Sequence, residues 1–501
     1  MSTLISKTTF LEFLMCPKNI WLKLHRPELM KLFSLSAFEL QLAEQGNEVE
    51  AYARNLFPGG VLVTETGDEA VRETERFMLA EIPAIFQATF VVDGFIAKND
   101  ALAYDKKNAC FDLYEIKGTN SIKEEGKTRD HIDDLTFQAS VLKRAKVQTG
   151  KFFIIHLNKE YVRMGDLVPE ELFRVEDMTE KVIARMPQVE EQMEAAKYHL
   201  TQTEEPMKGC DCIFSGRSAH CSTFKHSNPQ VPEYSIHDLA RIGSSKKKLA
   251  TLVEREVFSL DDVPADVDLS DIQLNQLLVY RNQKPIIDLD AIRAEIEALI
   301  FPLYFLDYET FAPAIPMFTG YSPYKRIPFQ FSLHILDTPA GEVRHVEYLH
   351  EECSDPSEKV AEMLAEHILP EGSVISWNKS FEQGVNRELA LRQPDERIAL
   401  ERINTQMYDL RDVFQKQYYV HPDFRGKTSI KKVLPALVEG VRHADLDISE
   451  GGAASDAWWQ MISPTITEQE RAKIAKDLRT YCALDTYAMY QIWKHLRDMV
   501  S

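Results

Sequence analysis

Two carboxylates interrupt an apolar stretch of the sequence, YFLDYETF. Asp307 and Glu309 are two residues apart, so an extended chain places both side chains on one face. Glu382 follows the apolar run SVISW, and Tyr481 and Asp485 are four apart in a helical pattern, a spacing that puts them on one helix face. Four carboxylates that meet in one place require cations, and two divalent ions held by oxygen ligands would balance them. The pattern therefore predicts a metal site for phosphoryl transfer, with the Tyr481 hydroxyl orienting the attacking water.

A second group of such residues lies in FVVDGFIAKNDALAYDKKNACFDLYEIKGT, which we interpret as strands joined by turns. Glu115 and Lys117 are two apart on one strand face, and Asp100 precedes Glu115 by fifteen residues, as in the partner strand of a hairpin. Two carboxylates can bind a divalent ion while a lysine steadies the phosphate or positions water. Phosphodiester chemistry is again the prediction.

The seven cysteines are an odd number, which does not suit a disulfide framework. Three of them fall within KGCDCIFSGRSAHC and are grouped as metal ligands often are: Cys210, Cys212 and Cys221. Three others stand singly in apolar surroundings and are predicted to be small buried side chains: Cys110, Cys353 and Cys482.

The elements that must position the C-terminal carboxylates begin near residue 299. Three strand-like runs, YFLDYETF, FQFSLHIL and VRHVEYLH, follow one another at meander spacing. An amphipathic helix, the strand SVISW and a helix opening at 379–381 come next. A long final helix begins after Thr467, which suits an N-cap. We expect an α/β fold with three parts, 1–225, a helical connector at 226–298, and 299–501.

The chain has 501 residues and a net charge of -20, which argues against binding polyanions by bulk electrostatics. Bound cations would invert the sign of the charge near acidic sites. A local basic patch, formed by Arg425, Lys427, Lys431 and Lys432, is predicted to contact a phosphate backbone, with a solvated surface as the alternative. No apolar run reaches the roughly 18 residues of a membrane span, and the N-terminus lacks a signal-peptide pattern. We therefore expect a cytoplasmic protein without a membrane partner.

The C-terminal region resembles the DEDD exonucleases of the ribonuclease H-like superfamily, in the subgroup whose last motif is Tyr-x-x-x-Asp. The resemblance rests on DYE at 307–309, NKSFE at 378–382 and YCALD at 481–485, in the family's order. It implies a mixed central sheet flanked by helices and Mg²⁺ or Mn²⁺ bound by Asp307, Glu309, Glu382 and Asp485. Glu382 stands where the family usually has an aspartate.

The N-terminal region resembles the PD-(D/E)xK nucleases, with a restriction-endonuclease-like fold and Asp100, Glu115 and Lys117 as the triad. Glu50, four residues after Gly46, falls where the RecB-like branch carries a metal-binding histidine. Gln138, in DLTFQASVL, falls where that branch has a glutamine near the active site. The resemblance implies Mg²⁺ or Mn²⁺ bound by the three carboxylates, with Lys117 and Gln138 assisting catalysis.

RecB-like nucleases of the AddB and CRISPR-associated kinds hold an iron–sulfur cluster with one cysteine before the nuclease core and three after it. The residues in those places here are Cys16, Cys210, Cys212 and Cys221. The resemblance implies a 4Fe–4S cluster. The spacing of one residue and then eight leaves zinc as the alternative, with His220 or His226 as a further ligand.

Stretches such as GNEVEAYARNLFPGG, LNKEYVRMGDL and GKTSIKKVLPAL resemble a bacterial family in which a RecB-like nuclease domain is fused to a DEDD exonuclease domain. This resemblance implies a hydrolase, a metal-dependent nuclease with two active sites. DNA is the expected substrate, because RecB-like relatives act on it, in repair or in defence against foreign DNA. An RNA-processing 3′–5′ exonuclease and a nucleic-acid-binding scaffold with one decayed site are the alternatives. Nothing in the sequence identifies protein partners.

Overall fold

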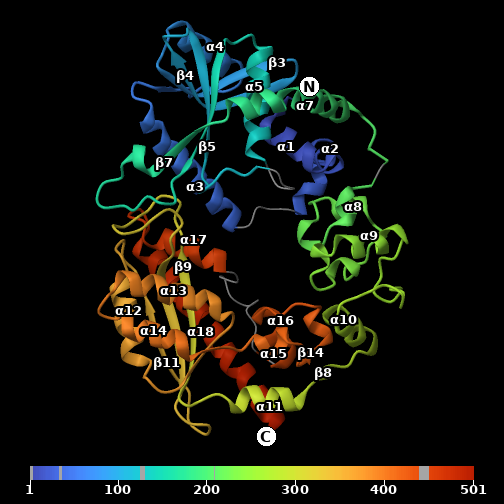
Figure 1. The fold of residues 1–501 in the computed structure, drawn as a ribbon, viewed down its shortest axis with the longest axis vertical. Helices are drawn as coiled ribbons and strands as arrows, with labels where there is room; N and C mark the ends of the chain where they lie inside the picture. Colours follow the sequence, from blue (N-terminus) through green and yellow to red (C-terminus); the bar gives the residue numbers. More distant parts are fainter. Residues whose placement is uncertain (1–3, 33–36, 125–129, 208, 439, 441–450) are drawn as a thin grey trace. The chain divides into compact units, whose positions relative to one another are not determined.

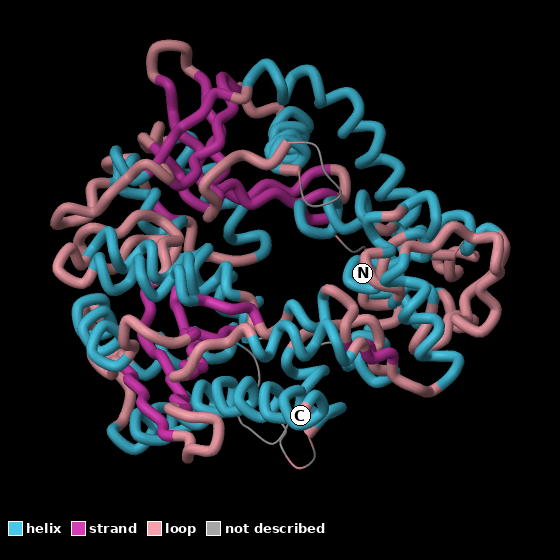
Figure 2. The backbone as a smooth tube through the Cα atoms, turned by 60° about the horizontal axis from the view of Figure 1, so that its bottom comes forward, coloured by secondary structure: helices cyan, strands magenta, loops and turns pink. Residues whose placement is uncertain are grey.

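The computed structural model describes residues 4–32, 37–124, 130–207, 209–438, 440 and 451–501. The chain divides into two compact units. The first unit comprises Met1–Ile213, Ala219–Pro229 and Pro313–Tyr324, and the second comprises Phe214–Ser218, Gln230–Ala312 and Lys325–Ser501. Figure 1 shows the elements coloured along the chain. Each unit combines a mixed sheet with helices (Figure 2), which confirms the predicted α/β class.

The first unit is built on a seven-stranded sheet in the order β2-β3-β4-β5-β6-β7, with β1 also paired to β4. Its strands are β1 (Ile5–Ser6), β2 (Val61–Leu62), β3 (Ala84–Val92), β4 (Phe95–Asp105), β5 (Cys110–Lys117), β6 (Thr149–Leu157) and β7 (Phe173–Asp177). Strands β3, β4 and β5 form an antiparallel meander, which confirms the predicted hairpin, whereas β6 is parallel to β5.

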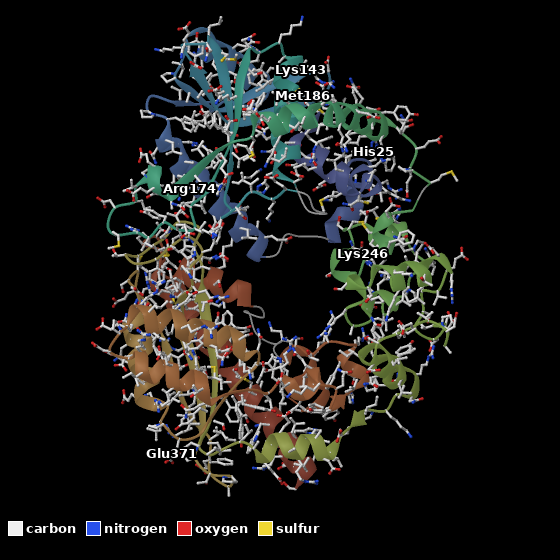
Figure 3. All side chains as sticks on the ribbon, viewed as in Figure 1. His25, Lys143, Arg174, Met186, Lys246 and Glu371 are labelled. Carbon is white, nitrogen blue, oxygen red and sulfur yellow. The ribbon has the colours of Figure 1, made fainter. Side chains whose placement is uncertain are left out.

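The helices of the first unit are α1 (Lys7–Met15), α2 (Pro17–His25), α3 (Ala37–Ala53), α4 (Gly67–Leu79), α5 (His131–Arg144), α6 (Pro169–Leu172), α7 (Thr179–Thr201) and α8 (Phe224–Ser227). The crossover helix α5 begins at an aspartate cap, since the Asp130 carboxylate accepts from the Ile132 N–H at 2.7 Å. Its buried face joins the core of the sheet. Lys143, labelled in Figure 3, lies in its last turn and donates to Glu190 of α7 at 2.9 Å.

The segment Pro313–Tyr324 belongs to the first unit although it follows β9, a strand of the second unit, along the chain. The Gln45 side-chain oxygen accepts from the Ala314 N–H at 2.9 Å, and the Tyr324 hydroxyl donates to the Gly118 carbonyl, one residue beyond Lys117. Ala314 and Ile315 are buried in an apolar cluster with α3 and β6. The segment therefore completes the packing around the end of β5.

The second unit contains a five-stranded sheet in the order β11-β10-β9-β12-β13. Its strands are β9 (Leu303–Phe311), β10 (Ile327–Leu336), β11 (Arg344–Leu349), β12 (Ser373–Ser376) and β13 (Met407–Asp409). The first three form the predicted antiparallel meander, and β12 and β13 add in parallel. A separate two-stranded sheet joins β8 (Ile286–Ile287), from the stretch expected as a connector, to β14 (Tyr419–Val420).

The helices of the second unit are α9 (Lys246–Glu254), α10 (Asp271–Asn282), α11 (Leu289–Glu297), α12 (Ser357–His367), α13 (Lys379–Arg392), α14 (Arg397–Gln406), α15 (Asp412–Gln415), α16 (Ile430–Leu437), α17 (Gly451–Met461) and α18 (Glu468–Val500). Thr467 caps α18 in a reciprocal box with Glu470, as the sequence predicted. Among the described residues, no helix combines the length and the apolar content that crossing a bilayer would require.

Alternation along β9 divides the core of the second unit between the two faces of its sheet. Tyr304 and Leu306 pack with α12, α13 and α14, whereas Leu303 and Phe305 pack with α18. Asp307 and Glu309 continue the series that begins with Leu303 and Phe305. The two carboxylates therefore face α18.

Candidate metal centres

The second unit brings Asp307, Glu309 and residues of α18 together on the α18 side of β9, whereas Glu382 comes from α13. Helix α18 carries Tyr481, Cys482 and Asp485, and the Cys482 sulfur lies 3.8 Å from Asp307 Oδ2. Ligand atoms of Asp307, Glu309 and Cys482 all lie within 4.8 Å of one another. A strand and a helix far apart in sequence thus supply a compact group of oxygen and sulfur atoms.

Three of the four carboxylates of this site are buried, and their charges act on the half-buried Asp307. Glu309, Glu382 and Asp485 are 7%, 2% and 9% exposed. Burial raises the pKa of Asp307 well above its usual range, and the charges of Asp485, Glu309 and Glu382 raise it further. Burial and Asp485 likewise raise the pKa of Glu309, and burial raises that of Glu382 to about 8. The group is therefore an unfavourable place for negative charge until cations are bound.

Tyr481 and Lys431 complete the surroundings of these acids. Burial and the charges of Asp485, Glu309 and Asp307 raise the pKa of the Tyr481 hydroxyl, which keeps its proton. The Lys431 ammonium on α16 lies 5.5 Å from the centre of the Tyr481 ring and lowers the pKa of Glu309. Lys431 is thus the member of the predicted basic patch that reaches the acids.

The other members of the basic patch lie at the surface. Arg425, Lys427 and Lys432 are exposed, and the Arg425 guanidinium lies over the Tyr234 ring at 5.4 Å. Asp409, at the end of β13, accepts from the backbone N–H groups of Asn378 and Lys379, each at 3.1 Å. That carboxylate therefore caps the start of α13, the helix that carries Glu382.

The first unit gathers its predicted site residues around a pocket of about 730 Å³. Glu115, only 1% exposed, accepts from the Lys117 ammonium at 2.7 Å and from the Gln138 amide at 2.5 Å. Asp100 on the neighbouring strand accepts from the Ile116 N–H at 2.8 Å. The hairpin thus places the predicted triad on the pocket wall, and α5 holds the buried Gln138 against the Glu115 carboxylate.

Two lysines balance the negative charge of this pocket. Lys7, at the start of α1, lies 2.7 Å from Glu115 and 3.4 Å from Asp134, and Lys117 also binds Asp134. Burial alone would raise the pKa of Glu115, but the Lys117 and Lys7 ammoniums hold it below its usual range. Asp100 is less well compensated, since burial and Glu115 raise its pKa while Lys7 lowers it.

Glu50 lines the same pocket but is held by other partners. Its Oε1 accepts from Arg54 and from Gln87, each at 2.7 Å. Gln87 adopts a positive φ of 56° within β3, where the ladder skips from Phe86 to Ala88. In the part of the chain that the structure describes, Asp100, Glu115 and Glu50 do not form a group with ligand atoms within 4.8 Å of one another.

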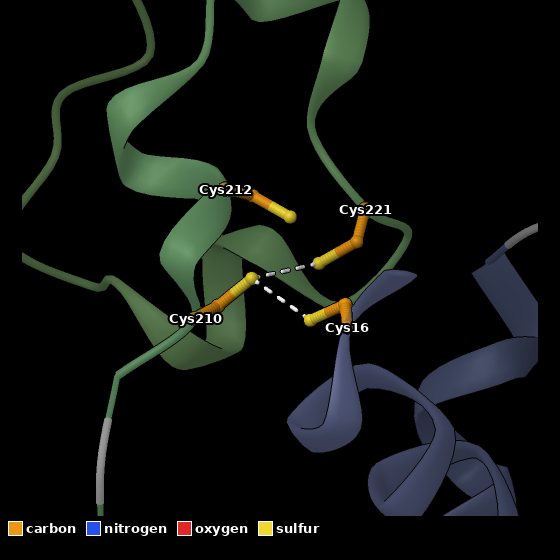
Figure 4. A group of neighbouring side chains, drawn as sticks. All are labelled: Cys16, Cys210, Cys212 and Cys221. Carbon is orange, nitrogen blue, oxygen red and sulfur yellow. Dashed lines mark hydrogen bonds between the residues drawn. The ribbon is translucent and has the colours of Figure 1, made fainter. Parts of the chain in front are cut away.

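The four predicted cysteines converge (Figure 4). The sulfur of Cys210 lies 3.2 Å from that of Cys16 and 3.3 Å from that of Cys221, and all four sulfurs, including Cys212, lie within 4.8 Å of one another. All four are free thiols. Hydrogen bonds from the other three lower the pKa of Cys212, which favours its thiolate. This cluster can hold a metal.

The two segments that carry the cysteines are tied together beside the cluster. Asn19, on α2 just after Cys16, accepts at Oδ1 from the Thr223 N–H at 3.1 Å and from the Thr223 hydroxyl at 2.8 Å.

The two histidines considered as zinc ligands lie apart from the four sulfurs. The His220 ring stacks on Phe224, and His226 pairs with Glu205 at 3.1 Å. Neither belongs to the group of four ligand atoms.

Several site residues were missed from the sequence. Asp134 lies one helical turn before Gln138 on α5, a spacing that could have identified it, whereas no spacing identifies Lys7. Cys482, predicted to be a small buried side chain, is buried, but its sulfur faces Asp307. The same prediction was wrong for Cys353, which is exposed because it lies in the loop after β11, outside the core.

Comparisons with known proteins give one family match and several similar proteins. Residues 304–429 match the family model described as "Domain of unknown function (DUF2779)", a span that contains Asp307, Glu309 and Glu382. The chain is 26% identical over 270 residues to "Uncharacterized protein UU173" of Ureaplasma parvum, covering 49% of this chain and 39% of that protein. It is 24% identical over 216 residues to "Uncharacterized protein MG366" of Mycoplasma genitalium, covering 39% and 32%. The aligned part thus spans only about two fifths or less of these relatives.

Proposed function

We propose that the protein is a metal-dependent nuclease with a phosphodiester-hydrolysing site in each unit. The observation that carries the proposal is a set of acids from β9, α13 and α18 whose charges act on Asp307: the buried side chains of Glu309, Glu382 and Asp485. Clustered buried carboxylates are destabilising without cations, so a fold that gathers them is suited to binding metal.

The donor set of the second unit fits Mg²⁺ or Mn²⁺, which prefer carboxylate oxygens. When bound, such ions would neutralise the acids, activate water and stabilise the leaving oxygen. The protonated Tyr481 hydroxyl would orient the attacking water by donating a hydrogen bond to it. The Lys431 ammonium, beside the Tyr481 ring, would attract the substrate phosphate.

In the first unit, Asp100 and Glu115 would hold the ion and Lys117 would steady the phosphate. Gln138 fixes the Glu115 carboxylate from one side, and Asn99 orients Gln138 by donating to its amide oxygen at 2.9 Å. Glu50 reaches the pocket as a further candidate ligand, although Arg54 and Gln87 hold it in this structure. The lysines already on Glu115 would have to yield to an ion there.

For the four cysteines we propose a 4Fe–4S cluster, on the resemblance to RecB-like nucleases, with a single zinc ion as the second candidate. Thiolates about 2.3 Å from a tetrahedral zinc lie about 3.8 Å apart, and the sulfur separations of 3.2 and 3.3 Å are somewhat shorter than that. Visible absorption of an anaerobic preparation, with iron and zinc analysis, separates the two. A brown protein carrying iron supports the cluster, and a colourless protein with stoichiometric zinc excludes it.

DNA is the proposed substrate and RNA the competing one, and a role in DNA repair or defence follows by analogy alone. The test uses Asp307→Ala and Glu115→Ala separately, with end-labelled single- and double-stranded DNA and RNA in Mg²⁺ or Mn²⁺. We expect each change to remove the cleavage that its own site performs. If neither reduces cleavage of any substrate, the protein is not a nuclease of this design, and a nucleic-acid-binding scaffold is the better account.

A further inference from the structure

The site on α18 contains a sulfur atom that its carboxylate motifs do not require. Cys482 is fully buried, and its Sγ is 3.8 Å from Asp307 Oδ2. Zinc binds carboxylate oxygen at about 2.1 Å and thiolate sulfur at about 2.3 Å, so tetrahedral ligands of these kinds lie about 3.6 Å apart. The observed separation therefore suits two ligands that share one ion.

Two buried oxygens in the neighbourhood of this group point independently to a bound ligand. Gln330 is paired across the sheet with Glu309, on the same face, and is 0% exposed. Its amide nitrogen donates to the Leu478 carbonyl of α18 at 3.0 Å, but its Oε1 finds no hydrogen-bond partner among the described residues. Oε2 of Glu382, 2% exposed, also has none within the described chain. Buried oxygens without partners are costly, which indicates that a bound group satisfies them.

A plainer interpretation makes Cys482 a small packing residue that donates a weak hydrogen bond to Asp307. That interpretation accounts for its burial, but it leaves both oxygens unsatisfied. A purely magnesium-specific site would satisfy the oxygens and would have no use for the sulfur, since Mg²⁺ prefers oxygen ligands. A thiophilic ion gives the Cys482 sulfur a role beside the Asp307 and Glu309 carboxylates.

We propose that this site binds a thiophilic divalent ion of the zinc class, with Cys482 Sγ as a ligand beside the Asp307 and Glu309 carboxylates. The inference rests on the carboxylate site of the proposed nuclease and deepens it by naming the class of ion that one position prefers. Zn²⁺ and Cd²⁺ accept mixed oxygen and sulfur ligands, whereas Mg²⁺ gains nothing from the sulfur.

The test is cadmium-113 NMR of the full chain, because the resonance position reports how many sulfurs bind the ion. The four-cysteine cluster would give a sulfur-rich signal, or none where its own metal remains. We expect a separate signal at a position typical of one sulfur with oxygens. Cys482→Ser should move or remove this signal and weaken cadmium binding at this site at least tenfold, the scale on which even groups outside the ligand shell act.

Cys353→Ser is the matched control, since that exposed cysteine lies in the same unit and outside both groups, and it should leave every signal in place. Cys482→Ala repeats the test without a hydroxyl, with circular dichroism to verify folding. If both Cys482 variants unfold, the wild-type spectrum still decides, because an all-oxygen signal, or none besides the sulfur-rich one, overturns the inference.

The outcome is separable from that of the proposed nuclease activity. A mixed sulfur–oxygen signal that Asp307→Asn and Cys482→Ser both abolish, in a protein that cleaves no nucleic acid, supports the inference and removes the proposed function. Cleavage that depends on Asp307, with cadmium signals identical in wild type and Cys482→Ser, removes the inference and leaves the proposed function standing.

Discussion

The two acidic sites manage buried negative charge in opposite ways. In the first unit the Lys7 and Lys117 ammoniums both contact Glu115, whose pKa lies below its usual range. In the second unit the acids mainly face one another, and the pKa values of Asp307, Glu309 and Glu382 are raised. A buried charge must be paired or neutralised. The lysines of the protein balance the first site, whereas the second site requires bound cations.

Removing one acid from each site should change the free energy of unfolding in opposite directions, and this is the largest difference we expect between the two sites. Glu115→Ala leaves two lysines without their main partner, so we expect the free energy of unfolding to fall by about 4 kcal/mol. Asp307→Asn removes a repelling charge, so the metal-free protein should be unchanged or more stable by up to about 1 kcal/mol. Urea unfolding with divalent ions chelated measures both.

Glu176→Ala is the control for this pair, since its carboxylate is half exposed and contacts His156 at 2.9 Å. Its loss should cost less than about 1 kcal/mol. Equal destabilisation by Glu115→Ala and Asp307→Asn would show that the two sites are balanced alike.

The second-largest expected effect is a pH dependence of the free energy of unfolding that comes from the second unit. The pKa of Glu382 is raised to about 8 from 4.5, so the folded protein binds more protons than the unfolded chain between these values. This contribution is complete below about pH 4.5 and is lost as the pH rises through 8. Between pH 5 and pH 8 the metal-free wild type should therefore lose about 3 kcal/mol more than Glu382→Gln.

Glu388→Gln, on the same helix, is the matched control, because Glu388 pairs with Lys325 at 3.4 Å outside the acidic group. It should keep the wild-type pH dependence, followed as the melting temperature across this range. A Glu382→Gln profile that parallels the wild type would show that the acids of the second unit are already compensated.

Added metal ions should stabilise the protein through the second unit, by a slightly smaller free energy than in the preceding prediction. A ligand that binds only the folded state at a hundred times its Kd stabilises by about 2.7 kcal/mol. We expect Mn²⁺ to raise the melting temperature of the wild type and of Glu115→Gln, but much less that of Asp307→Asn. A manganese response that depends on Glu115 alone would reverse the assignment of the cation-requiring site.

Local periodicity explains why much of the architecture could be predicted from the sequence. The alternation in YFLDYETF placed Asp307 and Glu309 on one face, and the four-residue spacing placed Tyr481 and Asp485 on one side of α18. Such patterns depend on neighbours in the chain, which the sequence displays directly. The meander, the hairpin and the Thr467 cap are of the same kind.

The features that the sequence did not reveal depend on contacts between distant residues. Lys7 meets Glu115 across 108 positions, and Gln87 reaches Glu50 from a position within β3 where its φ is positive. The sulfur of Cys482 becomes a candidate ligand only because Asp307, 175 positions earlier, lies beside it. No local pattern encodes such pairings, because tertiary packing decides which side chains share a site.

The smallest effect, and the finest test of the comparison, concerns Lys7. Its ammonium lies on the same Glu115 oxygen as that of Lys117, so a divalent ion must compete with it for that carboxylate. We expect Lys7→Met to tighten Mn²⁺ binding in the first unit about tenfold, or about 1.4 kcal/mol. The measurement is manganese titration in an Asp307→Asn background, which removes binding at the other site.

Lys23→Met, whose lysine pairs with Glu12 at 3.0 Å, is the control and should leave the affinity unchanged. Weaker binding in Lys7→Met would instead mean that Lys7 supports the ion, and that the first unit is arranged for metal in spite of its lysines.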